Sequence, residues 1–258
     1  MKNILLPLFL TIGILNATAQ VSGGKYNKLF DEFLMEDYDG CYKQALKMTE
    51  KDEYRKEPEP YLYVAMVLLK YSEMPERSEE FPNAVKDAAK YAAKAAKYDQ
   101  KERNAKSEDS AEEDAAGYYW ENNQEFFNKL KRIIMDEAEY YFNEDNFSKA
   151  ASTYKRILKV DPEDENILMI TGASQYKSRN VGEGKMSIET AVKLIQDKYK
   201  DEDYEANETT VTALEDGVAT YIDYLFENDQ KDEAKAFYDS IYESLSWNSN
   251  IRALKSKF

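Results

Sequence analysis

The residues able to catalyse a reaction or to hold a metal ion are unevenly represented in this chain. Its 258 residues include no histidine and one cysteine, Cys41, against 50 aspartates and glutamates. Without histidine the chain lacks the commonest general base, the Ser-His-Asp and Cys-His arrangements and the commonest zinc ligand. Acid–base chemistry or metal binding would therefore depend on carboxylates.

The carboxylates do not form a recognisable site in the sequence. Asp136, Glu137 and Glu139 lie among lysines and arginines on an expected helix, which is typical of a solvated charged surface. Residues 161–166, DPEDEN, lack the central glycine and the distal glutamate of a calcium loop, and residues 182–184, GEG, follow no expected strand. We predict no catalytic, cofactor-binding or metal-binding residue. A hydrolase using two carboxylates stays an alternative, which would need a pocket to hold them.

The helices that carry these carboxylates are clearest in residues 131–164. Ala138 and Ala150 lie twelve positions apart, and we expect the two helices to cross there, because larger side chains would hold the backbones apart. The other characteristic positions are Tyr141, Phe147, Tyr154, Ile157 and Pro162. This pattern resembles one tetratricopeptide repeat, which consists of two antiparallel helices in about 34 residues that stack on neighbouring pairs.

The same pattern returns further along the chain. Gly172, Gly184 and Ala191 follow Ala138, Ala150 and Ile157 at a distance of thirty-four residues. A third copy consists of Ile222, Ala234, Tyr238 and Ile241, fifty residues later. We expect the additional residues to extend a second helix to about residue 199 and to form a polar connection over residues 201–209.

The pattern is weaker towards the N-terminus. A first hairpin is expected to begin at residues 26–35, with Cys41 as a buried small residue on its second helix. Another pairs residues 61–74 with the alanine-rich helix around Ala92, after an insertion at residues 73–82. No segment alternates with the period of a strand. We predict an all-α protein, an α-solenoid of about five antiparallel helical hairpins.

Two segments before the clearest repeat stand out. Residues 100–116 contain charged residues, serine and alanine but no large apolar residue, so we expect them to be flexible. Within them, Ser110 resembles the acceptor of some periplasmic O-linked glycans. Residues 118–143 have helical periodicity and predict one long helix. Its aromatic start, residues 118–120, is either covered by the preceding helix or exposed as a contact patch.

Residues 1–19 have the pattern of a secretory signal peptide. Lys2 precedes a twelve-residue apolar stretch at 4–15, and Ala17-Thr18-Ala19 provides a cleavage site before Gln20. The stretch is too short to span a bilayer, and no later segment is long enough. We expect residues 20–258 to form one exported, soluble, periplasmic domain without membrane insertion.

The charge of the chain limits its partners. The formal net charge is −15 at pH 7. Such a surface repels phosphate backbones and anionic lipid headgroups, so we predict no binding to nucleic acid and no docking on membranes. The acidity either keeps the protein in solution or attracts a basic partner segment.

The resemblance also implies a binding surface, because this family binds partners on the concave surface formed by the first helix of each hairpin. Carried over residue by residue, this surface consists of Met135, Glu139, Phe142, Met169, Ala173, Tyr176, Ala219, Asp223 and Phe226. The lysine and asparagine clamp that some members use for a carboxylate tail is absent. Methionine and aromatic side chains suit an apolar or basic partner helix or peptide, although they could equally pack between repeats.

We therefore expect a non-enzymatic scaffold or adaptor, without a cofactor, in a periplasmic complex for envelope transport or assembly. A glycan-binding module of the cell envelope is an alternative, since helical repeats with exposed aromatic residues occur in sugar-capturing outer-membrane proteins. The carboxylate-dependent hydrolase is the second alternative.

Overall fold

The computed structural model describes residues 26–109, 123–201, 204 and 207–258. This part of the chain contains helices and no strands. Its eleven α-helices and two 3₁₀ helices are, in chain order, α1 (Asn27–Leu34), α2 (Tyr38–Glu50), α3 (Pro58–Ser72), η2 (Pro75–Arg77), α4 (Ala84–Asp109), α6 (Gln124–Asn143), α7 (Phe147–Leu158), α8 (Glu165–Lys177), α9 (Val181–Lys198), α10 (Val211–Glu227), α11 (Lys231–Tyr242), α12 (Ser249–Ala253) and η4 (Leu254–Lys257).

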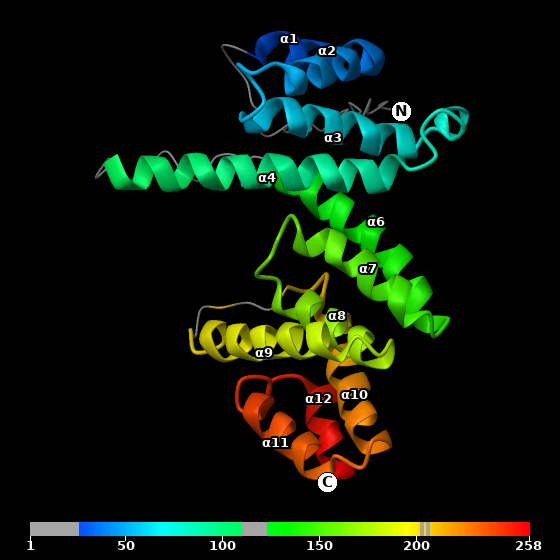
Figure 1. Ribbon diagram of the computed structural model, residues 1–258, viewed down its shortest axis with the longest axis vertical. Helices are drawn as coiled ribbons and strands as arrows, with labels where there is room; N and C mark the ends of the chain where they lie inside the picture. Colours follow the sequence, from blue (N-terminus) through cyan, green and yellow to red (C-terminus); the bar gives the residue numbers. More distant parts are fainter. Residues whose placement is uncertain (1–25, 110–122, 202–203, 205–206) are drawn as a thin grey trace, which may run out of the picture.

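Consecutive helices pack against each other in pairs, and the pairs follow one another along the long axis of the molecule (Figure 1). The pairs are α1 with α2, α3 with α4, α6 with α7, α8 with α9, and α10 with α11. The prediction of an all-α protein is confirmed, and the arrangement is compatible with a helical-repeat solenoid. Helices α12 and η4 lie at the C-terminal end of the stack.

Four of the five pairs are joined by the same turn. One residue in each turn has a left-handed backbone: Glu36 (φ 60°), Asp145 (φ 56°), Arg179 (φ 67°) and Asp229 (φ 60°). The N–H of this residue donates to the carbonyl three positions earlier, and the next N–H donates to the carbonyl five positions earlier, at 2.8 Å in all four turns. Together these bonds form the Schellman motif that ends many helices. The α3–α4 pair instead contains the predicted insertion, which includes η2.

The same four pairs share one crossing geometry. Twelve positions separate the two residues at each crossing, which are Leu29 and Cys41, Ala138 and Ala150, Gly172 and Gly184, and Ile222 and Ala234; all of them are buried. The thiol of Cys41 lies 3.6 Å from the Leu29 carbonyl. A Cβ at Gly172 would lie 3.1 Å from the Gly184 carbonyl oxygen, so these two backbones are in contact. The predicted crossing positions are buried, as expected for a close approach of the helices.

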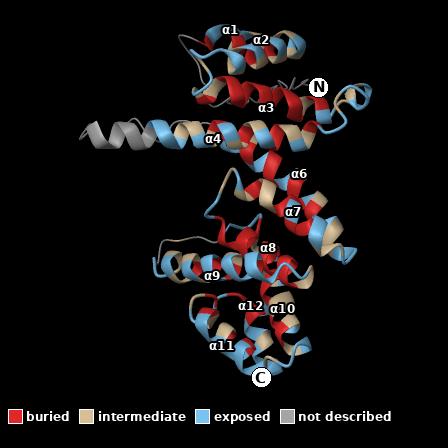
Figure 2. Ribbon diagram, in the orientation of Figure 1, coloured by how far each residue is buried: buried red, intermediate tan, exposed pale blue. Residues whose placement is uncertain are grey.

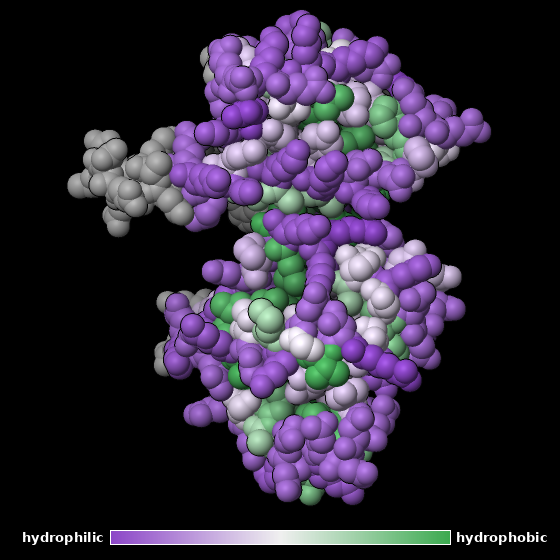
Figure 3. Space-filling model, in the orientation of Figure 1, coloured by the Kyte–Doolittle hydropathy of each residue, from purple (hydrophilic) through white to green (hydrophobic). Residues whose placement is uncertain are grey.

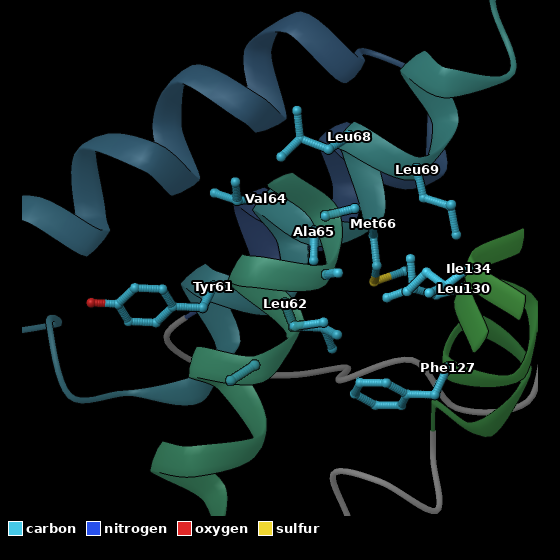
Figure 4. Close-up of a cluster of buried hydrophobic side chains, with 14 of the residues drawn as sticks. Tyr61, Leu62, Val64, Ala65, Met66, Leu68, Leu69, Phe127, Leu130 and Ile134 are labelled. Atoms are coloured by element: carbon cyan, nitrogen blue, oxygen red, sulfur yellow. The ribbon is translucent and has the colours of Figure 1, made fainter. Parts of the chain in front are cut away.

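The centre of the core is formed by helices that are covered on every side. Figure 2 shows α3 and α8 buried along most of their length. Leu62 and Met66 of α3 lie towards Phe127, Leu130 and Ile134 of α6 (Figure 4). This contact joins the second helix pair to the third. The core is therefore continuous from the N-terminal pairs into α6.

Helix α8 is enclosed by α7, α9 and α10. The contact with α10 is close because Gly217 lies against the α8 backbone, where a Cβ would be 2.7 Å from the nitrogen of Ile170. Nearby, the Asn166 amide donates to the Thr210 hydroxyl at 2.8 Å. The polar connection before α10 thus allows that helix to lie directly on α8.

The structure corrects two predicted boundaries. Helix α4 continues to Asp109, so residues 100–109 are helical, because alanine, lysine, glutamate and arginine favour a helix even without apolar anchors. Helix α6 begins at Gln124 rather than at residue 118, since Asn123 is its N-cap with φ −123°. The signal peptide, Ser110 and the aromatic residues 118–120 lie outside the described residues.

Candidate partner-binding surface

Four residues of the predicted binding surface belong to the core. Met135 is 4% exposed, Met169 0% and Tyr176 8%, and Ala173 is also fully buried. Met135 of α6 is part of the first core cluster. On α8 the other three are buried because α10 covers the face that the resemblance would leave open. The Tyr176 ring packs against Tyr221 of α10, with centroids 4.8 Å apart. These side chains hold the repeats together and are closed to a partner.

Two further residues are contacted by the C-terminal segment, residues 254–258. Asp223 of α10 forms an ion pair with Lys257. The ring of Phe226 lies 5.6 Å from that of Phe258, which also approaches Tyr238 at 5.2 Å. The chain itself therefore contacts the part of the predicted surface that lies on α10.

Glu139 and Phe142 of α6 remain accessible. Both side chains are half-buried, and the Phe142 ring stands edge-to-face on Phe147 at 5.4 Å. Tyr140, which the sequence did not indicate, is 62% exposed on another side of the same helix, with its ring 5.6 Å from that of Tyr141. The C-terminal half of α6 thus presents aromatic side chains and a carboxylate to solvent.

The carboxylates on this surface repel one another. Partial burial, followed by repulsion from Asp136 and Asp216, raises the pKa of Glu139. Partial burial and repulsion from Glu215 raise the pKa of Asp216 on α10. Among the described residues neither Glu139 nor Asp216 has a lysine or arginine as an ion-pair partner. A cation placed between α6 and α10 would relieve this repulsion.

A buried ion-pair cluster fixes α6 against the start of α8. The Lys131 ammonium, 7% exposed, lies 3.0 Å from Asp161 and 2.9 Å from Asp164. Burial alone would lower the pKa of Lys131, but attraction to the two carboxylates outweighs it and raises the pKa. Asp164 also caps α8 by accepting from the Ile167 N–H at 3.0 Å. The DPEDEN segment therefore ends one helix and starts the next, as predicted.

The single cysteine has the core role that its position predicts. Cys41 is fully buried, and burial raises its pKa to about 12, so it is a thiol at neutral pH. A protonated, enclosed sulfur is a poor nucleophile and a poor metal ligand.

Two clefts lie outside the predicted surface. One of about 910 Å³ lies between α4 and the α7–α8 turn, and four lysines line it: Lys94, Lys97, Lys101 and Lys159. Another of about 440 Å³ lies between the α3–α4 insertion and the α6–α7 pair, where Arg156 pairs with Glu137 at 2.7 Å. Neither cleft is indicated by the sequence, since residues from distant helices form them.

The rest of the visible surface is mainly hydrophilic, with apolar side chains gathered in small patches (Figure 3). In the described part of the chain, no three histidine, cysteine, aspartate or glutamate side chains are grouped as metal ligands would be. No described helix has both the length and the hydrophobicity of a membrane span.

Comparison with known proteins gives no relative on which an assignment could rest. No protein-family model matches the sequence, and no curated protein is significantly similar to it.

Proposed function

We propose that this protein is a tetratricopeptide-like scaffold that binds a partner protein on the surface formed by α6 and α10. The observation that carries the proposal is the fourfold recurrence of one hairpin geometry, with the same left-handed turn and a buried crossing pair twelve residues apart. Stacked hairpins of this kind offer an extended surface rather than an enclosed site, and such surfaces bind peptides and helices.

The charges on this surface support a partner that is basic and partly apolar. Partial burial and repulsion from Asp136 and Asp216 raise the pKa of Glu139, burial and repulsion from Glu215 raise that of Asp216, and neither carboxylate is paired with a cation among the described residues. Phe142, three residues after Glu139 and therefore on the same side of α6, provides partly accessible aromatic surface beside that carboxylate. A segment with lysine or arginine beside an apolar side chain would satisfy both features.

The N-terminal pattern of a signal peptide supports a periplasmic location, and we propose that the scaffold acts in an envelope transport or assembly complex. Intact-mass measurement of the mature protein from a periplasmic extract tests the location. A mass that begins at Gln20 is expected, and a mass that retains Met1 would contradict it.

The proposed binding surface is tested by charge reversal. Glu139→Lys combined with Asp216→Lys should abolish crosslinking of the partner in envelope fractions, because both carboxylates would then repel it. Glu189→Lys, on an exposed face of α9, is the matched control and should leave the crosslink intact. If both variants stay helical by circular dichroism and both keep the crosslink, the partner does not use this surface.

One observation favours glycan binding as a second candidate. Trp247 is 47% exposed and its ring lies nearly parallel to that of Tyr199, with an interplanar angle of 8°. An exposed indole held flat in this way can stack on a sugar ring. Trp247→Ala should abolish retention on immobilised envelope polysaccharide if this candidate is correct, and retention by neither protein would exclude it.

A further inference from the structure

The C-terminal segment, residues 254–258, is held less firmly than the residues before it. In α12, Ile251 is fully buried, and the Asn248 side chain both caps the helix and donates to Glu215 at 2.6 Å. In the segment itself, the last ring, Phe258, is 43% exposed. Its ion pair is solvent-accessible as well, with side-chain exposures of 36% for Lys257 and 51% for Asp223.

Solvent-exposed ion pairs and half-exposed rings contribute little to stability. Leu254 is partly buried against the core and Lys255 lies over the Tyr242 ring, so they hold the start of the segment. Its last two residues can therefore leave α10 while α12 stays in place, which frees Asp223 from its ion pair and exposes more of Phe226. These two residues lie on the helix that also carries Asp216. Asp216 and Asp223 are seven residues apart, which corresponds to about two helical turns, so both carboxylates lie on the same side of α10.

We propose that residues 254–258 are a displaceable internal ligand of the α10 surface, and that the external ligand of this surface is a peptide with the same chemistry, a lysine followed by an aromatic residue. The structure shows how such a ligand binds. Its ammonium pairs with Asp223, and its ring lies against Phe226 and Tyr238. This inference rests on the proposed function, for which it names the partner class and a competing internal segment.

Competition is tested with the full-length chain. The variant Lys257→Glu with Phe258→Ser weakens the two contacts with Asp223 and Phe226 and leaves Leu254 and Lys255 in place. The probe is a fluorescent peptide of residues 253–258, ALKSKF. Its ends are acetylated and amidated, so that the peptide carries no terminal charges and binds through its side chains. By fluorescence anisotropy at low salt, we expect the variant to bind the probe about two- to fivefold more tightly than the parent protein, the range that a solvent-exposed ion pair supplies.

Charge exchange identifies the contact. Adding Asp223→Lys to the variant should weaken its binding of ALKSKF at least tenfold. The peptide ALKSEF should bind this triple variant better than ALKSKF does. A peptide ending in serine, ALKSKS, should bind the double variant at least tenfold more weakly than ALKSKF, because it lacks the ring that contacts Phe226.

Three outcomes would overturn the inference. The first is equal binding of ALKSKF by parent and double variant, and the second is no binding by a double variant that keeps its helical content and melting temperature. The third is a parent protein that sediments as a dimer and becomes monomeric on Lys257→Glu, since the segment would then be exchanged between copies. The Glu139 and Asp216 crosslinking result is independent of these outcomes, so the inference can fail while the proposed function stands.

Discussion

The α6–α7 pair and the α8–α9 pair contain the same thirty-four-residue pattern, but the surroundings of their first helices differ. On α6, Glu139 and Phe142 remain partly accessible, whereas Ala173 and Tyr176 at the corresponding positions of α8 are buried; Met135 and Met169 are buried in both pairs. The difference arises because α10 lies directly on α8. A repeat pattern therefore defines a hairpin and its crossing, while the neighbouring elements decide whether its inner face is a surface or a core.

The largest effect is expected from a substitution that breaks the contact between α10 and α8. In Gly217→Ala the new methyl group would lie 2.7 Å from the backbone nitrogen of Ile170, which cannot turn away as a side chain can. We expect a loss of about 3 kcal/mol in the free energy of unfolding, at the upper end of the range for overpacking. Gly182→Ala on α9, where nothing lies within 4 Å, is the control and should be neutral or slightly stabilising. Midpoints of chemical denaturation measure both variants, and equal midpoints would show that α10 does not pack on α8 this closely.

A smaller loss of stability is expected when the crossing of the α6–α7 pair is overpacked. Ala150 is fully buried, so Ala150→Leu should cost about 1 to 3 kcal/mol in the free energy of unfolding. Ser152→Leu places the same side chain two residues away on the exposed face of α7 and should change stability by less than about 0.5 kcal/mol. Similar denaturation midpoints for the two variants would show that the crossing has been placed wrongly.

The two pairs should respond alike to a change in their shared turn. Asp145 and Arg179 have φ values of 56° and 67°, which glycine adopts without steric cost. Asp145→Gly and Arg179→Gly should each stabilise the protein by about 0.5 to 1 kcal/mol, the usual penalty of a left-handed residue less the greater freedom of glycine in the unfolded chain. Thermal unfolding measures both. A gain at one turn and a loss at the other would show that their geometries differ.

The smallest expected effect depends on pH and concerns the partly accessible carboxylate of α6. The pKa of Glu139 is raised in the folded protein, so its stabilising contribution is present while the carboxyl is protonated and is lost as the pH rises through the folded pKa. Glu139→Gln should therefore raise the free energy of unfolding at pH 7, by less than about 1 kcal/mol because the group is partly solvated. The substitution should have no effect near pH 3. The same gain at both pH values would point to packing instead of charge.

The sequence by itself determined the helices, their pairing and their crossings. Small residues at a fixed spacing, such as Ala138 and Ala150, can be recognised without a structure because close helix packing restricts which residues fit. Cys41 was placed in the core for the same reason. These are local relations, within about thirty-four residues, and they depend on covalent spacing and on side-chain size.

Only the tertiary structure decided which faces are covered. Met169 and Tyr176 are as apolar as a binding groove requires, and nothing in their own repeat shows that α10 encloses them. That outcome depends on Gly217, forty-seven residues after Ile170, and on a polar connection long enough to bring α10 across. The contact of residues 254–258 with Asp223 and Phe226 is of the same kind. A sequence pattern reports the shape of a side chain, whereas its burial is set by whatever distant segment lies against it.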